Sequence, residues 1–178
     1  MNPDSKIVLV GMPGSGKSTL GRDAALQFNL DFYDLDECIE KAAGARITSI
    51  FEEKGEGYFR RLESQVLGQM LKQDKGFILA TGGGAPCFNH NMQLINRYSV
   101  SVFLDVPLNV ILNRLTGTQV EKRPLFYGLD TSEIILKLKS MYEERSPYYE
   151  KAKIKLSGED ISTELLVSEW MAHLKVKP

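Results

Sequence analysis

The chain has 178 residues, 43% hydrophobic and 25% charged, with 22 basic and 23 acidic side chains and a formal net charge of −1. This length predicts a single domain over residues 1–178 that needs no disulfide or metal to hold its core, and the charge balance argues against a nucleic-acid partner. With no signal peptide, no apolar run of about 18 residues and two distant cysteines, we expect a cytoplasmic protein with free thiols that does not contact a membrane.

Strands and helices are predicted to alternate along the chain. Short β-branched runs predict strands at 6–10, 31–33, 77–80, 98–104 and 153–156. Helical spacing of apolar residues predicts helices at 17–28, 37–43, 48–54, 58–72, 106–115, 132–146 and 161–174. Residues 116–129 are polar and predict a mobile loop, and Pro147 is expected to end the helix before it. This alternation predicts an open α/β sandwich with parallel strands and right-handed crossovers.

A phosphate-binding loop is the strongest motif. Residues 11–18, Gly-Met-Pro-Gly-Ser-Gly-Lys-Ser, fit the pattern of glycine, any four residues, glycine, lysine and serine or threonine. They lie between a predicted strand and a predicted helix, whose start favours an anion. Lys17 would bridge the terminal phosphates and Ser18 would offer its hydroxyl to Mg²⁺. The alternative is a plain glycine turn, but this context predicts a nucleoside triphosphate with Mg²⁺.

Two aspartates follow the predicted strand 31–33. Alternate residues of an extended chain face the same way, so we expect the carboxylates of Asp34 and Asp36 to point toward the phosphate loop. One would hold Mg²⁺ through water, and the other would accept a proton from an acceptor hydroxyl. The alternative is a helix-capping aspartate with a solvated neighbour. The phosphate loop favours the functional interpretation.

Three arginines are candidates for binding anions. Arg60 shares a helix face with Glu63, and the alternative there is an exposed ion pair that contributes little. Arg145 lies four residues after Met141 on an apolar stripe, where a cation usually has a fixed anionic partner. Arg123 lies in the predicted loop, where it would close over ATP or else be a solvated charge.

Three consecutive glycines, residues 82–84, follow the predicted strand 77–80. They would let the backbone approach a ligand closely, and the alternative is a flexible turn. His90 and His173 show no pairing and are assigned to structure. Tyr148 and Tyr149 are assigned to packing at a helix end.

Together these motifs resemble the shikimate kinases over almost the whole chain. The matching segments are Gly-Met-Pro-Gly-Ser-Gly-Lys-Ser-Thr at 11–19, Asp-Leu-Asp at 34–36, Phe-Arg-Arg-Leu-Glu at 59–63, Gly-Gly-Gly-Ala at 82–85, Arg-Pro-Leu at 123–125 and Glu-Arg-Ser-Pro-Tyr-Tyr at 144–149. Many P-loop proteins share the first, whereas the combination is specific. The resemblance implies a three-layer P-loop NTPase fold with a five-stranded parallel sheet in the order 2-3-1-4-5 and helices on both faces. It also implies a helical substrate-binding segment at about 35–63 and a lid at about 116–128.

The resemblance further implies that ATP, with Mg²⁺, phosphorylates the 3-hydroxyl of shikimate in aromatic amino-acid (chorismate) biosynthesis. Ser18 would hold the metal, assisted through water by Asp34. The nearest match to the family's adenine-stacking arginine is Arg114. The ATP-binding residues implied are Gly14, Ser15, Gly16, Lys17, Ser18, Thr19 and the lid residue Arg123.

On the acceptor side, the resemblance implies that Arg60 and Arg145 bind the shikimate carboxylate. Gly83 would offer its backbone N–H, and Asp36 would hold ring hydroxyls and orient or deprotonate the attacking one. The catalytic residues implied are Lys17, Asp36 and Arg123. We expect a monomer whose partners are shikimate and ATP. The alternatives are a related kinase acting on gluconate or a nucleoside monophosphate, and a nucleotide-binding module without catalysis.

Overall fold

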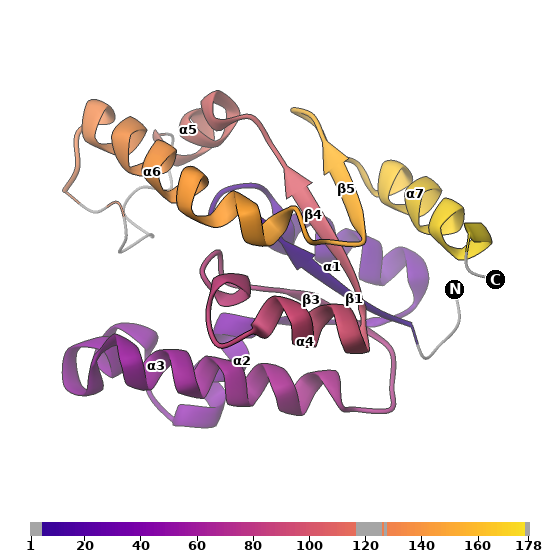
Figure 1. Cartoon of the computed structure of the whole chain (residues 1–178), viewed down its shortest axis with the longest axis horizontal. Helices are drawn as coiled ribbons and strands as arrows, with labels where there is room; N and C mark the ends of the chain where they lie inside the picture. Colours follow the sequence, from indigo (N-terminus) through magenta and orange to yellow (C-terminus); the bar gives the residue numbers. More distant parts are fainter. Residues whose placement is uncertain (1–4, 117–125, 127, 177–178) are drawn as a thin grey trace.

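The computed structural model describes residues 5–116, 126 and 128–176 (Figure 1). One five-stranded sheet crosses the molecule in the order β2-β3-β1-β4-β5, and every neighbouring pair is parallel. The strands are β1 (Lys6–Val10), β2 (Asp31–Asp34), β3 (Phe77–Ala80), β4 (Val100–Asp105) and β5 (Ile154–Ser157). The fold and strand order implied by the resemblance are therefore confirmed.

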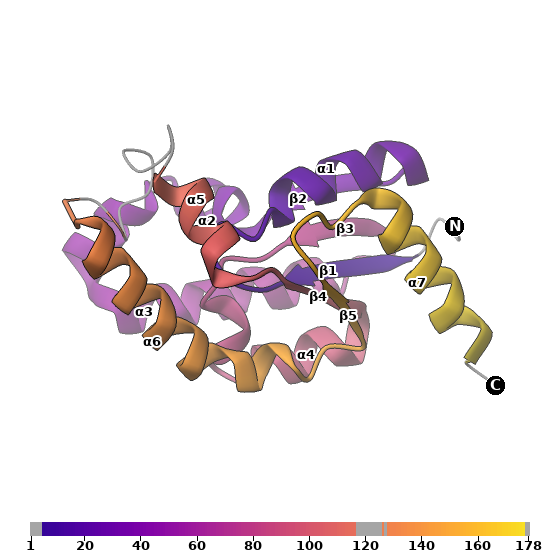
Figure 2. The ribbon, with the colours of Figure 1, turned by 90° about the horizontal axis from the view of Figure 1, so that it is seen from above.

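Helices cover both faces of this sheet. They are α1 (Lys17–Phe28), α2 (Leu35–Ala43), α3 (Ile47–Leu71), α4 (Asn91–Tyr98), α5 (Leu108–Thr116), α6 (Thr131–Tyr149) and α7 (Thr163–Val176), with a short 3₁₀ helix, η1 (Ala85–Cys87). Figure 2 shows α1 and α7 on one side of the sheet and α3, α4 and α6 on the other. No helix among the described residues combines the length and apolar composition needed to cross a membrane.

The two layers of the core follow from the alternation of side chains along the central strand. Ile7 and Leu9 pack in the cluster under α1 and α7, whereas Val8 and Val10 pack in the cluster under the other helices. All four side chains are fully buried. A strand covered on both faces reads as a continuous apolar run, which is why residues 7–10 carry no polar side chain.

Some predicted boundaries differ from the structure, whereas a predicted break between two helices is present. The predicted helices 48–54 and 58–72 meet in α3 at Gly55, whose backbone is not helical, with φ of 75° and ψ of 168°, so the predicted break between them is present. The predicted strand 98–104 begins only at Val100, because a helix that the sequence did not predict, α4, ends at Tyr98. The helix α6 continues past Pro147 to Tyr149.

Most of the expected lid lies outside the described residues. This applies to residues 117–125 and 127, and with them to the candidate residue Arg123. Within the lid range, Phe126 is described and is fully buried. It belongs to the same core cluster as residues of α5 and α6, so the Phe126 side chain packs on the domain.

Candidate active site

The predicted phosphate loop joins β1 to α1. Its glycines Gly11, Gly14 and Gly16 have φ values of 141°, 86° and 93°, which L-residues with a Cβ rarely adopt. A Cβ at Gly11 would also lie 2.8 Å from the carbonyl oxygen of Leu104 on β4. The loop conformation therefore requires glycine at these positions.

Lys17 holds the curled loop together from inside. Its Nζ donates hydrogen bonds to the carbonyl oxygens of Gly11 at 2.9 Å and Met12 at 2.8 Å. A third bond joins it to the hydroxyl of Ser15 at 3.4 Å. The Lys17 side chain is buried, so a positive charge lies at the centre of the loop, where its N–H groups can also receive an anion.

Ser18 and Asp34 bring oxygen ligands together beside this loop. The Ser18 hydroxyl donates to Asp34 Oδ2 at 2.8 Å. Asp34 ends β2 and also caps α2, since its Oδ1 accepts the backbone N–H of Asp36 at 3.1 Å. The capping role and the orientation toward the phosphate loop, which the sequence presented as alternatives, are both present. A hydroxyl and a carboxylate are the ligand types that suit Mg²⁺.

Asp36 reaches the site by a different route from the one predicted. It lies in the first turn of α2 rather than in an extended strand, so the argument from strand alternation is wrong. Its carboxylate nevertheless lies against the glycine turn, because a Cβ at Gly82 would be 2.9 Å from Asp36 Oδ1. Lost hydration and the charge of Asp34 raise the pKa of Asp36 from 3.8 to about 6, while Lys17 and Arg60 oppose the rise.

The glycine turn at residues 82–84 lies between two guanidinium groups. A Cβ at Gly83 would be 3.3 Å from Arg145 Nη1 and 2.8 Å from the ring of Pro13 in the phosphate loop. A Cβ at Gly84 would be 2.9 Å from Arg60 Nη2. These close approaches explain the three glycines, and they bring Arg60 from α3 and Arg145 from α6 to the same turn.

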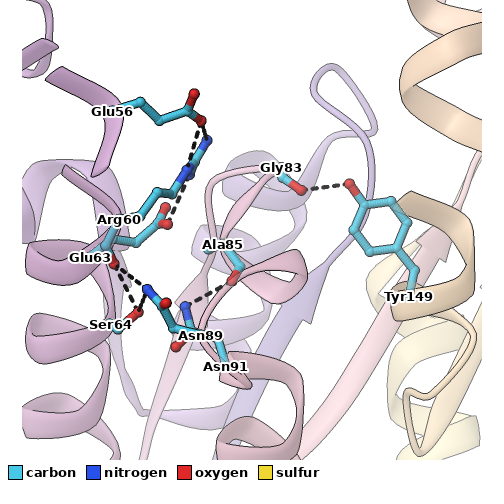
Figure 3. A network of polar contacts seen from close by, with 9 residues as sticks. All are labelled: Glu56, Arg60, Glu63, Ser64, Gly83, Ala85, Asn89, Asn91 and Tyr149. Carbon is cyan, nitrogen blue, oxygen red and sulfur yellow. Dashed lines mark hydrogen bonds and ion pairs between the residues drawn. The ribbon is translucent and has the colours of Figure 1, made fainter. Parts of the chain in front are cut away.

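Arg60 is held by two glutamates of its own helix (Figure 3). Its Nη1 bonds Glu63 Oε2 at 2.9 Å, and Glu63 is only 1% exposed. Its Nε and Nη2 lie 3.2 and 3.1 Å from Glu56 Oε1, which is exposed. Burial raises the pKa of the Glu63 carboxyl, and the Arg60 charge opposes that rise. The Arg60–Glu63 pair is therefore buried, and its interpretation as an exposed ion pair is wrong.

Tyr149 packs in the core, as the sequence predicted, and it also holds the glycine turn, which the sequence did not predict. Its buried hydroxyl donates to the carbonyl oxygen of Gly83 at 2.6 Å (Figure 3). It lies one helical turn after Arg145, so the two side chains share a face of α6. This i, i+4 spacing was the signal available, because it places both residues toward whatever Arg145 faces.

A cavity of about 700 Å³ opens beside the phosphate loop. On the loop side it is lined by Gly14, Gly16 and Thr19, and across from them by Arg114, Ile161 and Thr163. Arg114 joins the two walls, since its guanidinium donates to the carbonyl oxygens of Ser15 at 3.4 Å and Glu159 at 2.8 Å. The cavity has the size of a small-molecule site and meets the loop where phosphates would lie.

A model of the shikimate kinase family matches residues 13–175. The chain belongs to the shikimate kinase family. A curated shikimate kinase from Sulfurihydrogenibium sp. (strain YO3AOP1) is 38% identical over 169 residues, which cover 95% of this chain and 97% of the relative.

Solved structures of shikimate kinases agree with this assignment. The crystal structure of the shikimate kinase from Bacteroides thetaiotaomicron matches with a TM-score of 0.87 and 32% identity, covering 97% of this chain and 99% of that one. The shikimate kinase from Acinetobacter baumannii in complex with shikimate matches with a TM-score of 0.83 and 31% identity, covering 97% and 96%. The family likeness therefore extends over the whole fold.

Proposed function

We propose that this chain transfers the γ-phosphoryl group of ATP to the 3-hydroxyl of shikimate, giving shikimate 3-phosphate and ADP. This reaction is a step of chorismate and aromatic amino-acid biosynthesis. The observation that carries the proposal is the glycine turn at residues 82–84, which contacts the phosphate loop, Asp36 and both guanidinium groups. An acceptor with one carboxylate and neighbouring hydroxyls fits such a site, because paired guanidinium donors match a planar carboxylate. The family membership supports the same reaction.

On the nucleotide side, residues 14–19 bind the phosphates, and the cavity beside them receives the nucleoside. Lys17 exchanges its bonds to loop carbonyls for bonds to the phosphates. Mg²⁺ fits the Ser18 hydroxyl and, through water, the Asp34 carboxylate, which already lie 2.8 Å apart. When bound, the metal neutralises phosphate charge. Arg123 adds a second cation over the phosphates from the lid, residues 116–128.

On the acceptor side, Arg60 and Arg145 bind the carboxylate, and the Gly83 N–H donates to the substrate. Asp36 accepts a hydrogen bond from the attacking hydroxyl. With a pKa of about 6, Asp36 is ionised at neutral pH, yet it is a stronger base than an ordinary aspartate. Catalysis then consists mainly of positioning the two substrates and neutralising charge.

We further propose a single domain over residues 1–178, in which about 35–63 forms the substrate-binding segment, and a monomer in solution. The cytoplasm is the proposed location, because it supplies ATP and keeps thiols such as the free Cys38 and Cys87 reduced. Sedimentation at micromolar concentration tests the monomer, and a species of twice the mass of 20.0 kDa would contradict it.

The test of the reaction is ADP release coupled to a spectrophotometric signal, with Mg²⁺, ATP and millimolar shikimate. We expect release that depends on shikimate, and a product with the phosphorus resonance of a sugar-like phosphate monoester. Gluconate and a nucleoside monophosphate are run as alternative acceptors under the same conditions. Faster turnover of either acceptor would favour a related kinase. ATP binding without transfer to any acceptor would favour a nucleotide-binding module.

A further inference from the structure

Phe88 stacks on the guanidinium group of Arg60. The Arg60 Cζ lies 4.1 Å from the centre of the Phe88 ring. In the described part of the chain, other cations lie between 4.7 and 5.9 Å from a ring centre. Phe88 is 37% exposed, so the ring lies at the surface and covers Arg60 from outside the core.

The turn that carries Phe88 is hydrogen-bonded to α3, the helix that carries Arg60. The Asn89 side-chain amide donates to the backbone carbonyl of Arg60 and to the hydroxyl of Ser64, both at 2.9 Å (Figure 3). Asn89 and His90 both have left-handed φ values, 48° and 59°. Asparagine and histidine adopt this backbone more readily than most residues, and the two Asn89 hydrogen bonds hold the turn against α3. The ring of Phe88 is thus placed relative to Arg60 itself.

Different neighbours contact different parts of the Arg60 guanidinium. Glu63 and Glu56 bond its edges, and Gly84 approaches within contact of Nη2. Two rings lie beside the guanidinium, with the centre of Phe88 at 4.1 Å and the centre of Phe59 at 5.1 Å from Arg60 Cζ, so Phe88 makes the nearer aromatic contact. An arginine side chain has several rotatable bonds, and fixing its plane before binding removes an entropic cost.

We propose that Phe88 is a positioning residue that sets the plane of the Arg60 guanidinium for the acceptor's carboxylate. The inference rests on the proposed function, in which Arg60 binds that carboxylate. Phe88 acts through Arg60 and touches no reacting atom, so it contributes to acceptor binding rather than to the transfer step. The ring also shields one face of the guanidinium from water, which strengthens its charged hydrogen bonds.

The experiment compares four purified variants with the unsubstituted enzyme. Phe88→Leu and Phe88→Met remove the π face and keep apolar volume, whereas Phe88→Tyr keeps the face. Tyr98→Leu is the matched control, since Tyr98 is 36% exposed and stands 5.4 Å from Arg97, a pair on α4 with no role in the proposed site. For each enzyme we measure kcat, the KM for shikimate, the KM for ATP and the Tm.

We expect Phe88→Leu and Phe88→Met to raise the shikimate KM about two- to fivefold, the range of a partly exposed cation–π contact. The kcat and the KM for ATP should stay unchanged, and Phe88→Tyr and Tyr98→Leu should behave as the unsubstituted enzyme. An unchanged shikimate KM, or equal rises for both substrates, would overturn the inference. If the unsubstituted enzyme does not phosphorylate shikimate, the proposed function fails instead.

Discussion

Replacing Asp36 by Asn should make the protein more stable while it removes activity. Ionised Asp36 loses hydration in the site and faces the charge of Asp34, which together raise its pKa from 3.8 to about 6. Unscreened, this difference corresponds to roughly 3 kcal/mol of destabilisation when the carboxylate is ionised. Because Asp36 is exposed to solvent in the open site, we expect about 1 kcal/mol to remain after screening.

The sign follows from the raised pKa. Below pH 3.8 the carboxyl is protonated in the folded and the unfolded chain, so it costs nothing. The penalty grows as the pH rises from about 4 to about 6 and is constant above that. At pH 8, Asp36→Asn should therefore raise the Tm by about 2–4 °C, whereas near pH 4 the two proteins should melt together. Activity should fall by about 10²–10⁴-fold.

Thermal unfolding monitored by circular dichroism at several pH values measures the difference. Glu37→Gln is the matched control, since Glu37 lies in the same turn of α2, is exposed and pairs with the exposed Arg22. Its Tm and activity should stay close to those of the unsubstituted protein. A lower Tm for Asp36→Asn at pH 8, or a Tm difference that does not depend on pH, would refute the conclusion that the ionised Asp36 carboxylate destabilises the fold. The acid limb of kcat/KM should fall tenfold per pH unit below about pH 6.

Three further substitutions test the acceptor site. Arg145→Ala should raise the shikimate KM about ten- to a hundredfold, because charged hydrogen bonds are lost, and an unchanged KM would place the acceptor elsewhere. Tyr149→Phe removes only the hydroxyl that holds the glycine turn; it should lower the Tm by about 2–4 °C and raise the shikimate KM, whereas Tyr148→Phe should do neither. Glu56→Gln should lower the shikimate KM about two- to fivefold, because Glu56 occupies the Nε and Nη2 edge of Arg60; steady-state kinetics showing a higher KM would contradict this competition.

The elements that the sequence predicted well are those set by local pattern. The run at residues 7–10 is buried on both sides of the sheet, and a continuous apolar run needs no tertiary information to be recognised. The phosphate loop likewise depends on glycines whose φ values other residues rarely adopt, and their spacing is visible in the sequence. The strand order was also correct, but it was implied by the family resemblance and was not predicted from the local pattern.

The helix α4 could not be predicted because its stability is tertiary. Its sequence contains asparagines, which have low helix propensity, but Met92 and Ile95 are buried in the core. The Asn91 side chain also donates to the carbonyl oxygen of Ala85 at 2.9 Å. These contacts join α4 to η1 and outweigh local preference, so a pattern search over eight residues could not find it.

Pro147 and Asp36 are two positions where the local pattern predicted the wrong helix boundary. Proline normally breaks a helix interior, yet α6 continues for two residues because the buried Tyr149 is anchored on Gly83. Asp36 was assigned to extended chain, but Asp34 caps α2 so early that Asp36 is already helical. In both cases a single side-chain bond, invisible to periodicity, decided where the helix begins or ends.

The segments that surround the acceptor are separate from the loop that surrounds the phosphates. In the proposed site, the glycine turn after β3, α2, α3 and α6 supply the former, and the connection between β1 and α1 supplies the latter. The two parts adjoin at Gly83, where a Cβ would be 2.8 Å from the Pro13 ring. We therefore expect that substitutions in the glycine turn, α2, α3 and α6 can change which small acid the enzyme accepts, while the sequence of the phosphate loop is kept.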